Sequence, residues 1–229
     1  MFFLKEYSIF DIIGPIMIGP SSSHTAGAAR LGKVARSIAE GELKKVEFLL
    51  HGSFSKTYRG HGTDRALVAG ILGFEPWDER LRDSLSIAKE KNIEISFVEA
   101  DLGDVHPNTV KFLMTLKDNR LVEVMGSSIG GGNILISEVD SEKVEFNGNY
   151  PTLLIKHKDL PGMISKVSGV ISKANINIAF LKVFRISKGQ TATMVFETDS
   201  PVPEKVIDEI NELGNIENIR VINKAKEGE

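Results

Sequence analysis

The last third of the sequence alternates between two hydrophobic periods in an order that few folds accommodate. Four segments are apolar runs of strand length, and two segments between them carry apolar residues at helical spacing. The helical stripes are Ile164, Val167, Val170 and Ile171 in the first helix and Val206, Ile207, Ile210 and Leu213 in the second. The order is strand, helix, strand, strand, helix, strand, over residues 152–157, 163–175, 176–186, 191–198, 203–213 and 216–222. This βαββαβ order predicts a ferredoxin-like domain.

The preceding part of the chain is organised differently, with helices grouped early and strands grouped late. Helices are predicted from residue 23, from about residue 63 and over 78–92, and strands at 44–53, 93–100, 109–118, 120–128 and 133–140. The NGNYP stretch at 147–151 is rich in turn residues. The predicted fold class is therefore α+β: an N-terminal α/β domain with antiparallel strands at 1–147, a linker at 148–151, and the βαββαβ domain at 152–224.

Composition excludes several classes of function. The net charge of −3 gives no bulk attraction to nucleic acid or to an anionic membrane. No apolar run reaches the length of a membrane span, and the apolar start carries Lys5, Glu6 and Asp11, which argues against a signal peptide. We therefore expect a cytoplasmic protein. Cysteine is absent, which excludes disulfides, thiolate zinc sites, a cysteine nucleophile and an iron–sulfur cluster held by this chain alone.

The stretch GPSSSHT, residues 19–25, places an unusual number of hydroxyl groups at the start of a predicted helix. A helix N-terminus has unpaired N–H groups and a partial positive charge, so it suits a carboxylate or phosphate. The hydroxyls of Ser21, Ser22, Ser23 and Thr25 would add to that site, and His24 can move protons near neutral pH. The alternative is that Ser23 caps the helix and the other side chains lie in solvent.

Three further polar clusters follow along the chain. In the first, Ser53 and Ser55 follow a strand, and Gly60, His61, Gly62, Thr63 and Asp64 precede a helix, where Thr63 or Asp64 can equally be an ordinary cap. His51 and His61 do not have the spacing of zinc ligands, and no metal site is predicted. The second cluster, HPNT at 106–109, also reads as a turn. The third, GSSIGGGN at 126–133, lacks the ending of a P-loop but has glycines and serines that suit an anion.

Taken in order, these motifs resemble the beta chain of iron–sulfur-dependent L-serine dehydratase, and residues 152–172 resemble an ACT domain, a regulatory module of amino-acid metabolism. The resemblance implies conversion of L-serine to pyruvate and ammonia, with a [4Fe–4S] cluster held by the cysteines of a separate alpha chain. The first domain is also similar to the allosteric substrate-binding domain of some phosphoglycerate dehydrogenases. That similarity leaves open a regulatory module that binds serine or an anion and performs no chemistry.

The resemblance also implies roles for individual residues. His24 and His61 are the expected catalytic residues, and Ser21, Ser22, Ser23, Thr25, Thr63 and Asp64 are the expected substrate-binding residues. In the ACT-like domain, Asp159, Leu160, Pro161 and Gly162 match a loop that such domains often place at an effector site. The expected partners are the alpha chain, L-serine, and a second copy of this chain through the ACT-like domain, because the sheet edges of a lone βαββαβ unit favour association.

Overall fold

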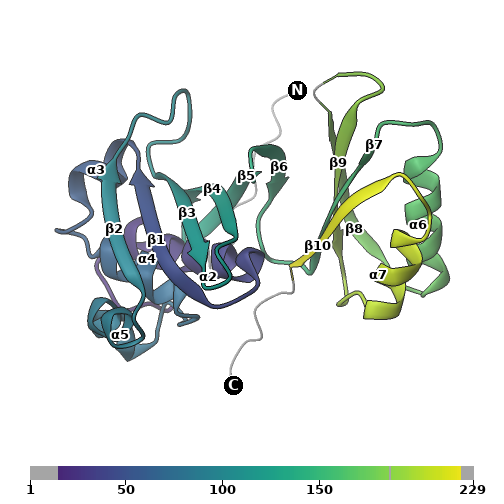
Figure 1. Ribbon diagram of the computed structural model, residues 1–229. Helices are drawn as coiled ribbons and strands as arrows, with labels where there is room; N and C mark the ends of the chain where they lie inside the picture. The colour runs from purple at the N-terminus through teal and green to yellow at the C-terminus, as the bar shows by residue number, and fades with distance from the viewer. Residues whose placement is uncertain (1–14, 186, 223–229) are drawn as a thin grey trace, which may run out of the picture. The chain divides into compact units, whose positions relative to one another are not determined.

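The computed structural model describes residues 15–185 and 187–222 (Figure 1). Residues 1–14, on which the expectation of no signal peptide rests, and 223–224, the end of the expected second domain, lie outside the described residues. The chain divides into two compact units, Met1–Leu135 and Ile136–Glu229. Among the described helices, none is both long and apolar enough to cross a membrane.

A six-stranded sheet with the order β2-β1-β3-β4-β5-β6 contains the strands of the first part of the chain. These are β1 (Leu43–Leu50), β2 (Glu94–Glu99), β3 (Thr109–Leu116), β4 (Leu121–Gly130), β5 (Asn133–Val139) and β6 (Glu142–Phe146). β1 pairs in parallel with β2, because helices connect them, whereas β1–β3, β3–β4 and β5–β6 are antiparallel. β6 is not predicted from the sequence, because its five residues lie between two groups of turn residues.

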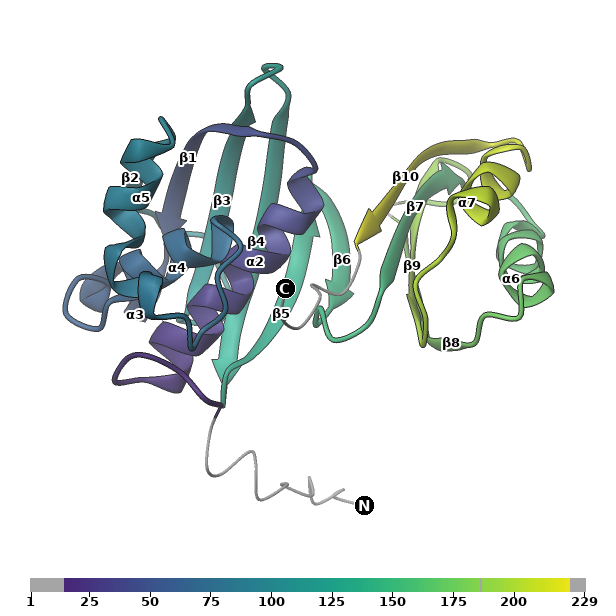
Figure 2. The same cartoon turned by 90° about the horizontal axis from the view of Figure 1, so that it is seen from below.

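The helices of the first unit lie on one face of its strands (Figure 2). They are the π-helical turn η1 (Ser22–Gly27), α2 (Ala28–Ala39), α3 (Gly52–Thr57), α4 (Thr63–Ile71), the 3₁₀ turn η2 (Glu79–Asp83) and α5 (Ser84–Glu90). The segment 78–92, expected as one helix, is therefore split between η2 and α5. The buried face of α2 includes Leu31, Ala35 and Ile38, as its apolar stripe predicts.

Two glycines allow α2 and α4 to cross in backbone contact. A Cβ atom added to Gly70 would lie 2.8 Å from the Cα of Gly32 and would overlap the carbonyl oxygen of Ala29. A Cβ atom added to Gly32 would in turn overlap the carbonyl oxygen of Leu67. Only glycine fits at these two positions, and the resulting close crossing fixes where the two helix N-termini lie.

The second unit contains a four-stranded antiparallel sheet of order β10-β7-β9-β8. Its elements follow as β7 (Thr152–Lys158), α6 (Met163–Lys173), β8 (Ile178–Arg185), β9 (Thr191–Thr198), α7 (Glu204–Asn211) and β10 (Ile216–Ile222), which is the predicted βαββαβ order. Together with the first sheet, this confirms the α+β class. Because the hydrogen-bonded sheet changes between β6 and β7, we retain residues 148–151 as a proposed domain boundary, although the compact units divide earlier, within β5.

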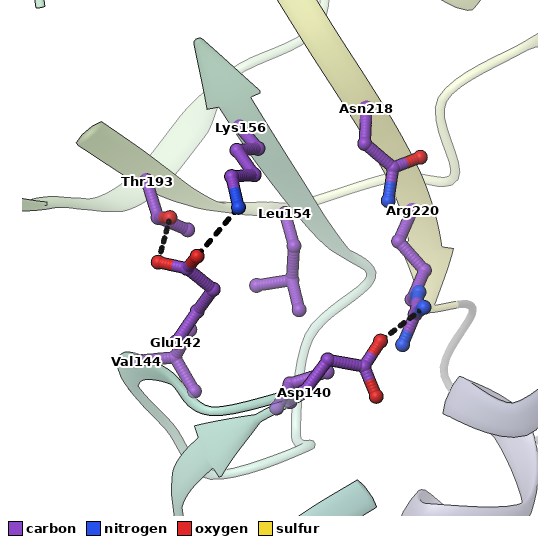
Figure 3. Close-up of a pocket in the computed structure, with 9 residues that line it drawn as sticks. Asp140, Glu142, Val144, Leu154, Lys156, Thr193, Asn218 and Arg220 are labelled. Carbon is purple, nitrogen blue, oxygen red and sulfur yellow. Dashed lines mark hydrogen bonds and ion pairs between the residues drawn. The ribbon is translucent and has the colours of Figure 1, made fainter. Parts of the chain in front are cut away.

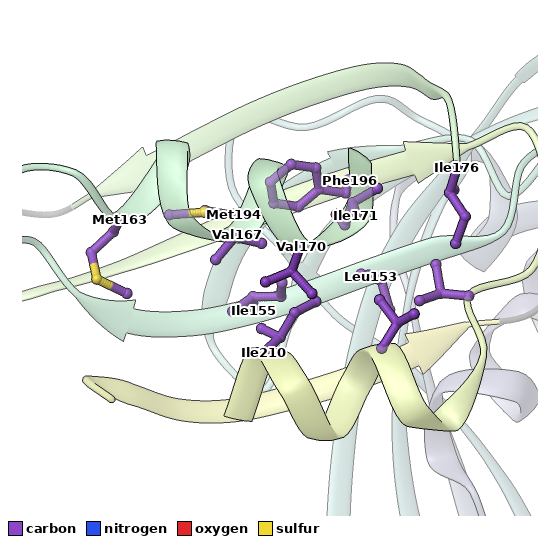
Figure 4. Packing of buried hydrophobic residues seen from close by; sticks show 12 residues of the cluster. Leu153, Ile155, Met163, Val167, Val170, Ile171, Ile176, Met194, Phe196 and Ile210 are labelled. Atoms are coloured by element: carbon purple, nitrogen blue, oxygen red, sulfur yellow. The ribbon is translucent and has the colours of Figure 1, made fainter. Parts of the chain in front are cut away.

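The core of the βαββαβ fold lies between its helices and one face of its sheet (Figure 4). Leu153, Ile155, Met194 and Phe196 extend from the strands toward the buried residues of α6 and α7, among them Val167 and Ile210. One expected core residue is wrong: Ile164 is 46% exposed, and Met163 is buried in its place. The helix begins at Met163, so the first apolar position of its stripe falls one residue earlier than the spacing suggested.

Candidate functional site

The hydroxyl-rich stretch forms the turn η1, which leads directly into α2. Ser21 occupies the N-cap position in an extended conformation, and its Oγ accepts a hydrogen bond from the backbone N–H of His24 at 3.2 Å. The capping residue is therefore Ser21 and not Ser23, because the helical turn starts one residue before the sequence pattern indicated. Ser22 and Ser23 are half-buried in the first turn. A single cap thus uses only one of the hydroxyls in this stretch.

His24 is where the first two motifs meet. Its Nε2 lies 3.1 Å from the Oγ of Ser53, and its Nδ1 lies 3.4 Å from the Oγ of Ser21. The His61 ring stands edge-on to the His24 ring, with 4.8 Å between their centroids, and Phe54 packs on His24 at 5.4 Å. Burial lowers the pKa of the His24 imidazole, and the neighbouring His61 lowers it further. The neutral form of His24, which can accept a proton, is therefore favoured.

The HPNT and GSSIGGGN motifs are held against the same region by backbone hydrogen bonds. The N–H of Ser53 donates to the carbonyl of Pro107 at 2.8 Å, and the N–H of Ser128 donates to the carbonyl of Asn108 at 2.9 Å. Gly52 has a φ of 57°, and a Cβ atom there would lie 2.7 Å from the Pro107 oxygen. The turn η1 packs against both β4 and α4. All four polar clusters of the sequence therefore converge on the start of α2.

Three buried hydroxyls at this convergence have no partner among the described residues: Thr25 Oγ1, Thr63 Oγ1 and Ser128 Oγ. Each comes from a different motif, and all three residues are at most 1% exposed. A buried hydroxyl without a hydrogen bond is unfavourable, so each of these groups needs a partner that the described residues do not supply, either an ordered water or a ligand. Thr63 is therefore not an ordinary cap, since the α4 N-cap position is occupied by Gly62 with no side-chain capping bond.

Other candidate residues have local partners. Asp64 is half-buried, and its Oδ1 accepts the N–H of Arg65 at 2.8 Å; burial raises the pKa of its carboxyl. His51 Nδ1 accepts the N–H of Leu102 at 3.2 Å, and the exposed His106 accepts the N–H of Asn108 at 3.1 Å. Among the described residues, no group of three or more His, Cys, Asp or Glu side chains is arranged to hold a metal ion.

The loop Asp159–Gly162 borders a separate pocket of about 560 Å³ at the start of α6. Asp159 Oδ2 accepts hydrogen bonds from Arg185 Nη1 and from the N–H of Gly189, both at 3.0 Å, and the latter bond is the main cause of the lowered pKa of its carboxyl. Gly162 has a φ of 88°, which only glycine adopts readily, and Leu160 is exposed. Pro161 also lines the pocket, so the four expected residues of this loop lie together.

His157 also lines this pocket, and the sequence reasoning missed it. It is 2% exposed, its Nδ1–H donates to the carbonyl of Lys158 at 2.7 Å, and its Nε2 is buried with no partner among the described residues. In the neutral ring this hydrogen bond leaves Nε2 as an acceptor. A histidine at an inward position of an otherwise apolar strand, two residues before the loop, was the available signal.

Comparisons with known proteins cover most of the chain. Residues 8–139 match the family model described as serine dehydratase beta chain, and residues 151–215 match the ACT domain model. The chain is 45% identical to the probable L-serine dehydratase, beta chain, of Bacillus subtilis (strain 168), a match that covers 93% of this chain and 96% of the relative. It is 43% identical to the L-serine dehydratase, beta chain, of Peptoniphilus asaccharolyticus, over 89% of this chain and 92% of that protein.

A more distant similarity is to the phosphoglycerate dehydrogenases, the second family that the sequence resembles. The D-3-phosphoglycerate dehydrogenase of Methanocaldococcus jannaschii is 30% identical over 86% of this chain, but the match covers only 37% of that protein.

Proposed function

Because the chain belongs to the serine dehydratase beta chain family and carries an ACT domain, we propose that it is the beta subunit of an L-serine dehydratase. The activity is the deamination of L-serine to pyruvate and ammonia, performed together with an alpha chain. The observation that carries this proposal is the contact of His24 with Ser53 and His61 beside three buried hydroxyls that find no partner in the described part of the chain. The regulatory alternative is less well supported, because the relatives matched along nearly their whole length are beta chains.

Elimination from L-serine needs an anchor for the α-carboxylate and a base for the Cα proton. We assign the anchor to the hydroxyls of Ser21, Ser22, Ser23 and Thr25 with the N–H groups of η1, and to Thr63 at the start of α4. His24 and His61 form the proton-handling pair, because one is kept neutral by burial and the other is exposed beside it. Asp64 is assigned to substrate binding on the family resemblance.

The imidazole takes the proton from Cα, the Cβ–O bond breaks, and the departing hydroxyl takes up a proton from the histidine pair, so that it leaves as water. The aminoacrylate then tautomerises to an imine, and water hydrolyses it to pyruvate and ammonia. This chain has no thiolate to ligate a cluster. We therefore place the [4Fe–4S] cluster, which supplies a Lewis acid for the departing hydroxyl, on the alpha chain.

The isolated chain is expected to be colourless, free of iron and unable to form pyruvate from L-serine. The reason is that it supplies the carboxylate anchor and the histidine pair but no ligands for the cluster. The measurement is iron content and pyruvate production, first for the chain alone and then after addition of the anaerobically reconstituted alpha chain. Turnover by the isolated chain at a rate comparable to that of the assembled enzyme would contradict the shared site.

We also propose that the ACT domain pairs with a second copy and binds an amino-acid effector, L-serine, at the pocket bordered by Asp159–Gly162. β8 is an edge strand of its sheet, and it exposes Phe180, Leu181 and Val183. Val183 also lines the pocket, which connects self-association with effector binding. The buried acceptor Nε2 of His157 suits the ammonium or hydroxyl group of the effector.

Val183→Lys is expected to weaken self-association by about tenfold or more and to reduce the serine dependence of the assembled enzyme's activity. A lysine at the centre of an apolar contact would bury an unpaired charge. The measurements are sedimentation of the full chain and the dependence of the assembled enzyme's rate on serine concentration. Val98→Lys is the matched control, since Val98 is 42% exposed on β2 and Val183 is 39% exposed on β8. Equal behaviour of the two variants would overturn this assignment.

A further inference from the structure

A second cavity in unit 2 lies on the side of β7 opposite to the loop pocket, and no role is assigned to it above. Lys156 and His157 are consecutive residues of β7, so their side chains point to opposite faces of the sheet. His157 lines the loop pocket, whereas Lys156 lines this second cavity (Figure 3). Its volume of about 160 Å³ is well above the ~10–15 Å³ that one water molecule needs, so it has room for a small ligand.

One wall of the cavity is positively charged and incompletely paired. Arg220 Nη2 donates to Asp140 Oδ2 at 2.6 Å, but Arg220 Nη1 is buried and has no partner among the described residues. Asn218 stands two residues earlier on β10, and its side chain therefore points to the same face as that of Arg220. A guanidinium and an amide together can donate to both oxygens of a carboxylate.

The opposite wall is a carboxylate that already neutralises a lysine. Glu142 Oε1 accepts from Lys156 Nζ at 2.6 Å, and Glu142 Oε2 lies 3.5 Å from Thr193 Oγ1. Figure 3 shows these groups on one side of Leu154 and the Arg220–Asp140 pair on the other. Leu154 is 6% exposed and Val144 is 2% exposed, so the surface between the two walls is apolar.

The charged residues that line the cavity favour one class of ligand over others. A phosphate or another dianion would meet the carboxylates of Asp140 and Glu142, and a simple cation would meet Lys156 and Arg220. A zwitterion of small size satisfies both walls at once. An aliphatic side chain on that zwitterion would cover the apolar surface between them.

We propose that this cavity binds a small aliphatic α-amino acid. Its carboxylate accepts hydrogen bonds from Arg220 and Asn218, its ammonium group donates to Glu142, and its side chain packs on Leu154 and Val144. This site is distinct from the loop pocket and does not depend on the serine dehydratase reaction.

The test is a titration of the ¹⁵N-labelled full chain with L-alanine. Saturable amide shifts are expected in residues 139–144 and 216–222. Propionate and ethylamine, which each lack one of the two charges, are expected to bind about tenfold more weakly or worse. Absence of saturable shifts, shifts confined to 157–165 or 19–25, or binding of propionate equal to that of L-alanine would overturn the proposal.

Two variants test whether Arg220 and Asn218 bind the carboxylate of the ligand. Arg220→Met is expected to weaken L-alanine binding about tenfold or more, and Arg120→Met, which alters an exposed arginine of unit 1, is expected to leave it unchanged. If Arg220→Met does not fold, Asn218→Asp decides the question. Asn218 is exposed, and the new carboxylate would repel that of the ligand, so binding should weaken by a similar factor. Undiminished binding by a folded Arg220→Met or by Asn218→Asp would contradict the assigned contacts.

Discussion

Turnover of L-serine by the assembled enzyme is expected to fall about a hundredfold or more when His24 is replaced by alanine, the range usual for loss of a positioned acid–base group. His24 touches Ser21, Ser53 and His61, so its removal takes away the side chain that joins the first two motifs. Assembly with the alpha chain should persist, because the turn η1 keeps Ser21 as its cap. The measurement is the steady-state rate of pyruvate formation, with assembly checked by size-exclusion chromatography.

Arg120→Ala is the control, since Arg120 is an exposed residue between β3 and β4, outside the four polar clusters, and its Nε pairs with Asp118 at 2.7 Å. It should retain turnover within about twofold, as expected for a surface substitution away from the reacting groups. If the His24→Ala variant assembles and keeps near-normal activity, His24 has no catalytic role, and His61 becomes the remaining candidate for the base.

The lowered pKa of His24 also predicts how the turnover rate depends on pH. Burial and His61 lower the pKa of His24, so its ring loses its proton at a lower pH than a histidine in solution does. A base must be unprotonated to act, and the acid limb of the pH–rate profile should therefore lie below the usual range of histidine. In the His24→Ala variant the position of that limb should change. An identical limb in both proteins would assign it to another group.

Much of the fold is predictable here because helical segments and strand-length apolar segments follow each other in a different order in the two domains. The first helix of the βαββαβ order follows from Val167, Val170 and Ile171 at helical spacing, which lie between apolar runs of strand length. The exposure of Ile164 could not be predicted in this way, because it depends on where α6 begins. The strand β6 is not predicted because its five residues are too few to show a hydrophobic pattern between the turns that flank them.

The site is predictable in its residue types but not in its contacts. Hydroxyls next to a histidine at a helix start indicate a carboxylate site from local chemistry alone. That His24 meets Ser53 across 29 positions of sequence is a tertiary fact, because the fold brings η1 and α3 together. That the hydroxyls of Thr25, Thr63 and Ser128 have no partner in residues 15–185 and 187–222 is likewise visible only in the folded structure. His157 shows the same limit, because its unpaired Nε2 depends on the packing around β7.

The close crossing of α2 and α4 therefore predicts a large effect far from any reacting atom. Gly70→Ala is expected to lower the free energy of unfolding by about 3 kcal/mol, the upper part of the usual range for overpacking. The added methyl group would overlap the carbonyl oxygen of Ala29 and lie 2.8 Å from the Cα of Gly32, and backbone atoms have no other rotamer in which to avoid it.

Gly169→Ala is the matched control, since it is also a glycine inside a helix, and a Cβ atom there meets nothing within 4 Å. Alanine in an open helix position is favoured over glycine, so this variant should gain roughly 0.5–1 kcal/mol of stability. The two changes in the free energy of unfolding, which should have opposite signs, are measured by urea denaturation of the full chain, monitored by fluorescence and by circular dichroism. Because the crossing sets the distance between His24 and His61, turnover of the assembled Gly70→Ala enzyme should fall as well, while Gly169→Ala should leave it unchanged. If both substitutions stabilise the chain, α2 and α4 do not touch at these glycines, and the positioning of the histidine pair must have another origin.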